Sequence, residues 1–184
     1  MKATEILMDE HRVIERVLNA LERATNRLSR GEEVYFRFFT GTGVFIREFT
    51  DACHHKKEEM VLFPALVDNG LSKNTGPVAV MLAEHAEGRR LAQGMRQATE
   101  RFQAGDIRMR DTLVQTAKAY ISLIRHHITK EDKVLFPMAN KVIPVDQQET
   151  ILSGFEPYDK DASGEGMHDK YYGLADRLEK ECLR

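Results

Sequence analysis

The chain has 184 residues, of which 42% are hydrophobic and 30% are charged, and its net charge is −2. This length suits one domain with a substantial core, and the charge argues against the clustered basic surface that nucleic-acid binding requires. With no membrane-length apolar run, no secretion signal and only Cys53 and Cys182, we expect a soluble cytoplasmic protein with reduced thiols.

Helical periodicity begins near the start of the chain and strand alternation is scarce. The first predicted helix spans residues 4–29, with Thr4 as its N-cap. The second spans residues 33–67 but contains Gly-Thr-Gly at 41–43. Because glycine weakens a helix, we expect either a kink there or a regular helix that begins only at Val44.

Two more long helices follow. The third is predicted over residues 77–104, with a proline in its first turn, and the fourth ends at Val142 after beginning at Asp106 or Met109. Four long helices with short connections predict an all-α, antiparallel up-down four-helix bundle over residues 1–144.

The remaining residues, 145–184, differ from the bundle. Glycine, proline and polar residues dominate 145–166, which predicts an irregular connection. Helical spacing of apolar residues returns over 167–183. We therefore expect a fifth, shorter helix that folds back and packs on the bundle.

The second and fourth predicted helices carry nearly the same string. HHKKEEMVLFP begins at His54, and HITKEDKVLFP begins at His127. A shift of 73 residues superposes the two strings and places Glu58 on Glu131. Residues four apart lie on one face of a helix, so each His-x-x-x-Glu pair points in one direction.

The first and third predicted helices also resemble each other. MDEHRVIERVL surrounds His11, and LAEHAEGRRLA surrounds His85, at a shift of 74 residues. Each half of the chain is thus a helical hairpin with one histidine on its first helix and one His-x-x-x-Glu pair on its second.

The fourth helix indicates that these residues are buried. His127 and Glu131 share a stripe with apolar residues that must face the interior, such as Ile124 and Leu135. A buried carboxylate without a partner is costly, so two carboxylates and four histidines in one core predict a metal centre. Imidazole and carboxylate suit iron, and two similar halves suit two ions; manganese or a mixed pair would accept the same ligands.

Each feature also has an ordinary interpretation when it is taken alone. A single buried histidine is usually hydrogen-bonded in the core, and the Lys-Lys-Glu-Glu run at 56–59 is typical of a solvated face. Likewise, we interpret Met60, Phe63, Phe136 and Met138 as core residues, and Cys53 as a buried apolar thiol. The agreement of residue type, spacing and repeat favours metal binding over these alternatives.

Over residues 1 to about 143 the chain resembles the hemerythrin-like family of the HHE cation-binding type, on the strings DEH, HHKKEEMVLFP, AEHAEGRR and HHITKEDKVLFP. The resemblance implies an oxo- or hydroxo-bridged pair of irons in a four-helix bundle. It further implies bridging carboxylates and terminal histidines, which here are Glu58, Glu131, His11, His54, His85 and His127.

The sequence departs from the oxygen-carrying members of that family. They have a histidine four residues after the third-helix histidine, where this chain has Arg89, which cannot bind a metal. They also have an aspartate five residues after the last ligand histidine. In this chain that position is Asp132, and Glu131, four residues after His127, competes with it. His55 is the nearest replacement ligand, and an iron-sensing hemerythrin domain of an animal ubiquitin-ligase subunit resembles this arrangement. His168, Tyr171 or Tyr172 of the fifth helix are the other candidates.

The helical periodicity around the doubled histidine points the other way from the repeat. Phe45, Phe49 and Ala52 define an apolar face that lies nearer His55 and Glu59 than His54 and Glu58. We give the register of the repeat precedence. His126 is predicted at the surface, and the groups expected to surround the ligands are Glu15, Glu59, Arg89 and Asp132.

The resemblance implies binding of, or reaction with, dioxygen, peroxide or nitric oxide at an open iron. Catalase-like or nitric-oxide-handling turnover by an oxidoreductase is one hypothesis. The alternative is a non-enzymatic iron or oxygen sensor, or an iron-handling module, whose fifth helix signals to a partner. Reversible oxygen carriage ranks third because of Arg89. No nucleic-acid or membrane partner is expected, and the sequence leaves the electron donor and the oligomeric state open.

Overall fold

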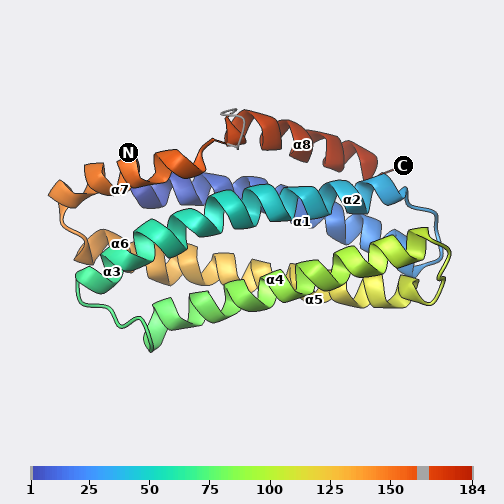
Figure 1. Cartoon of the computed structure of the whole chain (residues 1–184), viewed down its shortest axis with the longest axis horizontal. Coiled ribbons are helices and arrows are strands. Elements are labelled where there is room, and N and C mark those ends of the chain that lie inside the picture. Colours follow the sequence, from blue (N-terminus) through green and yellow to red (C-terminus); the bar gives the residue numbers. More distant parts are fainter. Residues whose placement is uncertain (1, 161–165, 184) are drawn as a thin grey trace.

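The computed structural model describes residues 2–160 and 166–183. Figure 1 shows long helical rods lying side by side along the long axis of the molecule. The first rod is α1 (Ala3–Ser29) and the third is α4 (Gly76–Gln103). The second comprises α2 (Phe36–Phe45), the π-helical segments η1 (Ile46–His55) and η2 (Glu58–Leu62), and α3 (Phe63–Asp68). The fourth comprises α5 (Met109–Lys130), the π-helical η3 (Glu131–Leu135), and α6 (Phe136–Val142).

The prediction of an all-helical chain is confirmed, since the described residues form helices, turns and a single isolated bridge between Lys160 and Gly166. No helix among residues 2–160 and 166–183 is long and apolar enough to cross a membrane. The predicted ends of the helices need small corrections. Because α1 already begins at Ala3, Thr4 is not its N-cap, and the Thr4 hydroxyl instead donates a hydrogen bond to Asn140 (3.0 Å).

The second rod is irregular, but not at the predicted place. Helix α2 runs through Gly41 and Gly43 without interruption, so neither the kink nor a start at Val44 is observed. The irregularity begins at Ile46 and consists of π-helical turns, whose i→i+5 hydrogen bonds widen the helix. Gly41 has a packing reason, because a Cβ atom there would lie 3.2 Å from Leu178 of the C-terminal helix.

The segment after the fourth rod is more ordered than predicted. It contains the 3₁₀ turns η4 (Val145–Gln147) and η5 (Glu156–Tyr158), with α7 (Gln148–Phe155) between them. Helix α7 forms because Ile151 and Phe155 bury their side chains in the core. Residues 161–165 of the predicted connection lie outside the described residues.

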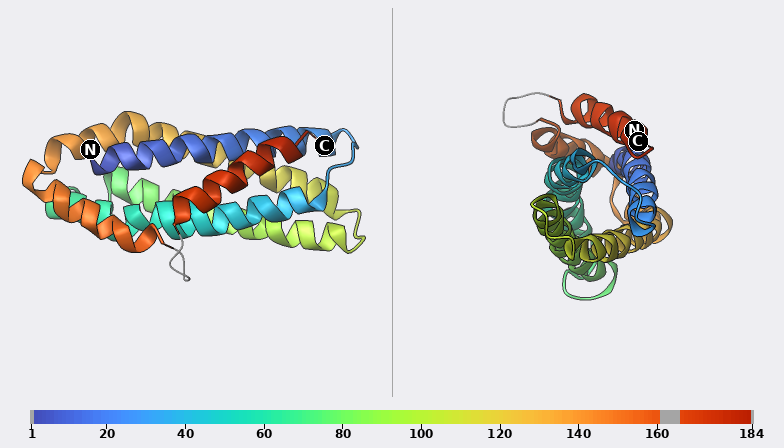
Figure 2. Two further views of the ribbon diagram at one scale, coloured as in Figure 1. Left: turned by 90° about the horizontal axis from the view of Figure 1, so that it is seen from above. Right: turned by 90° about the vertical axis from the view of Figure 1, so that its right-hand side faces the viewer.

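The predicted fifth helix is α8 (Met167–Glu181), which crosses α1 and α2 on the outside of the rods (Figure 2). Tyr171, Ala175 and Leu178 are buried on its inner face. Ion pairs from Arg16 of α1 to Asp176 and Glu179 hold the helix at its edge.

The interior contains two apolar clusters separated along the rods by polar residues. One cluster includes Leu7, Leu62, Met81 and Leu135, and the other includes Val13, Cys53, Leu91 and Ile128. On the first three rods, the histidines and glutamates predicted as ligands lie between these two sets. On the fourth rod, Glu131 lies between them, and His127 directly precedes Ile128 of the second set. Phe63 and Phe136 are core residues as predicted, but Met60 is 56% exposed and is not.

Candidate metal centre

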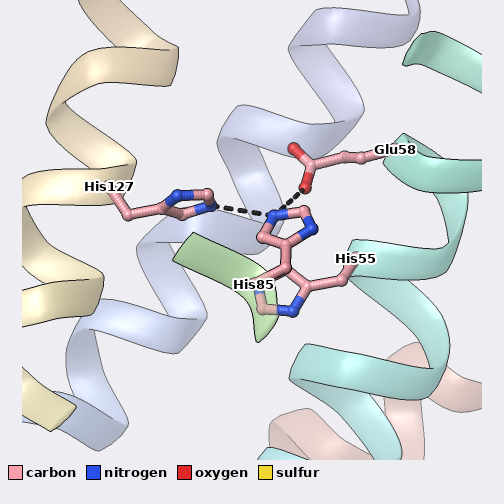
Figure 3. Close-up of side chains that lie close together, drawn as sticks. All are labelled: His55, Glu58, His85 and His127. Carbon is pink, nitrogen blue, oxygen red and sulfur yellow. Dashed lines mark hydrogen bonds and ion pairs between the residues drawn. The ribbon is translucent and has the colours of Figure 1, made fainter. Parts of the chain in front are cut away.

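Two groups of buried histidines and glutamates lie in the middle of the four rods. His55, Glu58, His85 and His127 form the first group, which Figure 3 shows converging from three rods. The second group consists of His11, His54, Glu58 and Glu131. In each group, one ligand atom per residue lies within 4.8 Å of the others, which is the spacing that a common metal ion requires.

The two glutamates connect the groups. Glu58 Oε1 lies 3.6 Å from His54 Nε2, and its Oε2 lies 3.3 Å from His85 Nε2, so each carboxylate oxygen faces a different group. Glu131 Oε2 lies 3.2 Å from the Nε2 atoms of both His11 and His127. The two carboxylates are therefore placed as bridges would be.

The inward-facing atoms lack the partners that buried polar atoms normally have. Both carboxylate oxygens of Glu58 and Glu131 are inaccessible to solvent and accept no hydrogen bond within the described part of the chain. The same is true of Nε2 of His11 and His54. Two further ring nitrogens, Nε2 of His85 and His127, lie only 3.0 Å apart. A set of unpaired donors and acceptors with this composition fits metal cations, which would satisfy all of them.

The opposite ring nitrogen of each of these four histidines donates a hydrogen bond to an outer carboxylate. His54 Nδ1 donates to Glu10 (2.8 Å), and His127 Nδ1 donates to Glu84 (3.1 Å). His11 Nδ1 donates to Asp132 (2.7 Å), and His85 Nδ1 donates to Glu59 (2.9 Å). This arrangement fixes the tautomer with Nε2 free, as in carboxylate–histidine–metal triads.

Cations on the outside neutralise these carboxylates. Lys57 pairs with Glu10, and Lys130 pairs with Glu84 at the position related by the 73-residue shift. Arg12 pairs with Asp132, and Arg89 Nη1 lies 2.9 Å from Glu59. Lys57 is fully buried, so the Lys-Lys-Glu-Glu run is not a solvated face as its ordinary interpretation would require. Each histidine thus belongs to a chain from cation to carboxylate to imidazole.

The electrostatics of the metal-free site keep protons between the histidines and the carboxylates. Burial alone would lower the pKa of His11, but its contacts with Asp132 and Glu131 raise that pKa to about 9. Burial likewise opposes the charge on His127, yet Glu131 and Glu84 raise its pKa to about 10. Burial would raise the pKa of Glu131, but His127 and His11 hold it well below its ordinary value. Metal ions would replace these protons.

The doubled histidine contributes both of its rings. His54 and His55 are 1% and 4% exposed, and they belong to different groups. The ring of His55 stacks on His85 with centroids 3.9 Å apart, and its Nδ1 has no hydrogen bond within the described residues. The register of the repeat predicted His54 as the ligand, and the periodicity of the second helix favoured His55. In the structure both histidines are buried. Ala52, which the periodicity placed on the apolar face, is exposed.

The other predicted residues lie around these groups rather than in them. His168 Nε2 donates to Glu10 Oε1 (2.8 Å), outside both groups, but with Glu10 and Asp159 it forms a third, less buried group that could hold a metal ion. Tyr171 packs on Phe45 and Phe49. Tyr172 packs on His168. Of the candidates for the missing ligand, His55 therefore faces the two groups, whereas the candidates on α8 do not.

The outer predicted groups differ in how close they come to the histidines. Glu59 and Asp132 contact histidines directly, and Arg89 contacts Glu59. Glu15 pairs only with Arg12, one step further out. His126 is exposed as predicted, and its Nδ1 donates to the Ser122 carbonyl.

The sequence analysis missed Glu10, Glu84 and Lys57. A signal was present, because Glu10 and Glu84 each directly precede a ligand histidine and are related by the same 74-residue shift. Lys57 and Lys130 are related by the 73-residue shift in the same way. Cys53 is a buried thiol, as predicted, and burial raises its pKa to about 12.

Comparison with known proteins agrees with this geometry. The sequence model of the hemerythrin HHE cation-binding domain matches residues 2–139, three quarters of the chain. The chain belongs to the hemerythrin HHE family. The match ends within α6, so α7 and α8 lie outside the part that the HHE domain covers.

Uncharacterised mycobacterial proteins are also similar to this HHE protein. Proteins of Mycobacterium tuberculosis and Mycobacterium bovis are 31% identical to it over 163 residues, or 89% of the chain. The chain spans 63% of the length of these curated relatives. No solved structure gives a significant match.

Proposed function

We propose that this HHE protein is a non-haem diiron protein that binds or reacts with dioxygen, peroxide or nitric oxide. The observation that carries the proposal is the pair of four-residue groups that share Glu58 and leave their inward-facing atoms without partners. In this proposal, the four rods are the antiparallel up-down bundle of hemerythrin-like proteins, and the protein is cytoplasmic.

The two groups differ in composition, and this difference supports an asymmetric centre. One ion would be held by His55, His85 and His127, and the other by His11 and His54. Glu58 and Glu131 would bridge the two ions. His55 would then fill the position that Arg89 leaves without a ligand.

A bound iron pair supplies Lewis acidity and two electrons. The chain's own residues prepare the place where that chemistry occurs. The outer carboxylates hold the imidazole rings with Nε2 directed inward, so little reorganisation accompanies metal binding. The apolar clusters on both sides exclude water and strengthen the electrostatic interactions within the site.

Metal analysis of the purified protein tests the proposal. We expect two irons per chain, with the near-ultraviolet absorption of a bridged ferric pair. Reaction of the iron-loaded protein with peroxide or nitric oxide should be lost in Glu58→Ala. One zinc per chain would contradict the iron pair, and iron-loaded protein that is inert toward all three small molecules would restrict it to a non-reactive role.

A second candidate function is an iron or oxygen sensor, or an iron-handling module. It is favoured by the contacts of the C-terminal segment with the site: His168 donates to Glu10, and Asp159 pairs with Lys57. Because Glu10 also accepts from His54, a change at the centre would be transmitted to α8 in this function. Reversible oxygen carriage ranks below both functions.

Limited proteolysis tests the sensor function. We expect the segment before α8 to be cleaved much faster in metal-free protein than in iron-loaded protein, and we expect His168→Gln to reduce that difference. Equal cleavage rates with and without iron would contradict a signalling role for α8.

A further inference from the structure

A cavity of about 460 Å³ lies between the second and third rods and ends at the candidate metal centre. Its walls come mainly from α2, η1 and α4, with Tyr120 of α5 at the back. Apolar side chains line much of it, including Phe39, Val44, Ile46 and Met95. A cavity of this size and lining is typical of a site for a small organic molecule.

Three buried polar residues that line the cavity lack hydrogen-bond partners within the described part of the chain. They are Thr50, His55 and Tyr120, all at most 4% exposed. Among the described residues, Oγ1 of Thr50 and Nδ1 of His55 are inaccessible and form no hydrogen bond, although Asp51 Oδ1 lies 3.5 Å from that nitrogen. No hydrogen bond is formed by the Tyr120 hydroxyl. Buried polar groups are normally paired, so three unpaired ones around one cavity indicate a ligand that would pair with them.

Buried helical threonines in this chain differ in their hydroxyl contacts, and Thr25 of α1 resembles Thr50 in forming none within the described residues. Thr42 donates to the carbonyl of Phe38 (2.9 Å), and Thr99 donates to that of Met95 (2.8 Å), which is the ordinary bond of a helical threonine. Thr50 lies in the π-helical η1 and makes no such bond. Thr50 thus has an unpaired hydroxyl and lines the cavity.

The position of His55 connects the cavity to the centre. The ring of His55 lines the cavity and belongs to the group with Glu58, His85 and His127. Charged side chains line the cavity near His55, where Asp51 pairs with Arg89. Further charged side chains line it away from His55, and Arg47, Arg96 and Glu100 there are 59%, 54% and 66% exposed. A molecule in the cavity would thus have its inner end at the centre, its body against apolar walls and its outer end near water.

We propose that this cavity binds an organic hydroperoxide with a hydrocarbon body, and that such a hydroperoxide is the peroxide substrate of the centre. The inference rests on the proposed function. The apolar walls favour a hydrocarbon body, because burying apolar surface contributes about 25 cal/mol per Å². A hydroperoxyl group has one donor and two acceptor oxygens, and so matches the hydroxyls and the imidazole at the inner end.

The proposed reaction balances with the iron pair as reductant. The O–O bond breaks, and one hydroperoxide with two electrons and two protons gives one alcohol and one water. A diferrous pair held by the centre would supply the two electrons, one from each iron. The protons come from water.

Gly43 provides a variant that fills the cavity without disturbing the ligands. It lines the cavity, and a Cβ atom added there meets no atom within 4 Å. Gly43→Leu should therefore occupy the space that the hydrocarbon body would use. The matched control is Gly173→Leu, because Gly173 is also helical and also has no atom within 4 Å of an added Cβ, but it lies on α8 away from the cavity.

Binding of a non-reactive product analogue is the first measurement. We expect 2-phenylpropan-2-ol, the alcohol formed from cumene hydroperoxide, to bind saturably to iron-loaded wild-type protein by calorimetry. Affinity should fall at least tenfold in Gly43→Leu and should not change in Gly173→Leu. No saturable binding to wild type, or equal binding to all three proteins, would overturn the proposal and leave a cavity that holds only water.

Single-turnover oxidation of the diferrous protein is the second measurement. We expect cumene hydroperoxide to react faster than hydrogen peroxide, and we expect the ratio of the two rates to fall at least tenfold in Gly43→Leu alone. An unchanged ratio would overturn the substrate class. Failure of the proposed function gives a different result. Neither peroxide would then oxidise any of the three proteins, whether or not the alcohol binds to them.

Discussion

At the scale of single residues, each candidate ligand depends on groups that do not face the centre. The imidazole of His54 is oriented by Glu10, and Glu10 is neutralised by Lys57. Glu84 and Lys130 do the same for His127. Because these outer groups set both ring orientation and ligand basicity, metal affinity should be as sensitive to them as to some ligands.

The first prediction concerns the outer carboxylates. In Glu10→Gln and Glu84→Gln, the amide oxygen can still accept from the histidine, but the negative charge is lost. We expect each variant to bind iron about 10- to 100-fold more weakly, as measured by competition with a chelator. Glu22→Gln is the control, since Glu22 pairs with Arg125 away from the centre. Wild-type affinity in both variants would show that the outer carboxylates only fill space.

The second prediction concerns the doubled histidine. Replacing His55 by glutamine removes one of the three imidazoles of the first group and leaves the second group intact. We expect one of the two irons to be released to a chelator much faster than the other, whereas in wild type both should be retained. His126→Gln, a change at the exposed neighbour of His127, should behave as wild type. Equal loss of both irons in His55→Gln would contradict a role confined to one ion.

At the scale of helices, the second rod buries two adjacent histidines and also supplies an unpaired hydroxyl to the cavity. All three residues, His54, His55 and Thr50, lie in the π-helical η1. Segments η2 and η3 are related by the 73-residue shift, so the same distortion recurs at Glu58 and Glu131. The distortion at the two glutamates thus belongs to the repeat, whereas η1 has no π-helical counterpart in α5.

The third prediction concerns the seat of α8 on α2. In Gly41→Leu, the new side chain would collide with Leu178, which lies 3.2 Å from the position of an added Cβ. We expect a loss of about 1–3 kcal/mol in the free energy of unfolding from overpacking, measured by urea denaturation, together with faster proteolysis of α8. Gly43→Leu, two residues further along the same helix, should lose no stability because it meets no neighbour within 4 Å. Equal destabilisation of both variants would show that the helix, and not the contact with Leu178, is affected.

At the scale of the whole molecule, the internal repeat explains why so much could be predicted. Apolar spacing defined the four rods, and the repeat selected the histidines and glutamates that the structure brings together. The π-helical turns could not be predicted, because an i→i+5 hydrogen bond requires no particular residue type. The sequence analysis therefore chose between His54 and His55, although the structure buries both. Helix α7 was missed because its eight residues contain few apolar ones, and its helix is stabilised by burial of Ile151 and Phe155.

The fourth prediction follows from charge in the interior of the metal-free molecule. The pKa values of His11 and His127 are raised to about 9 and about 10 by neighbouring carboxylates, above the value of about 6.5 in an unfolded chain. Between the pKa of the unfolded chain and those of the folded state, the folded state binds more protons than the unfolded state. The free energy of unfolding must therefore fall as pH rises through this range. We expect the metal-free protein to lose on the order of 3 kcal/mol of unfolding free energy between pH 7 and 9.5 in urea denaturation.

Iron should abolish this pH dependence. If Nε2 of His11 and His127 binds a metal, those nitrogens carry no proton to lose, and the free energy of unfolding should not fall over the same range. Binding of iron to the metal-free protein near pH 7 should also release protons, which a weakly buffered titration would detect. A pH-dependent fall that is equal with and without iron would show that these two nitrogens do not face a metal, because the same protons would then be titrating in both forms.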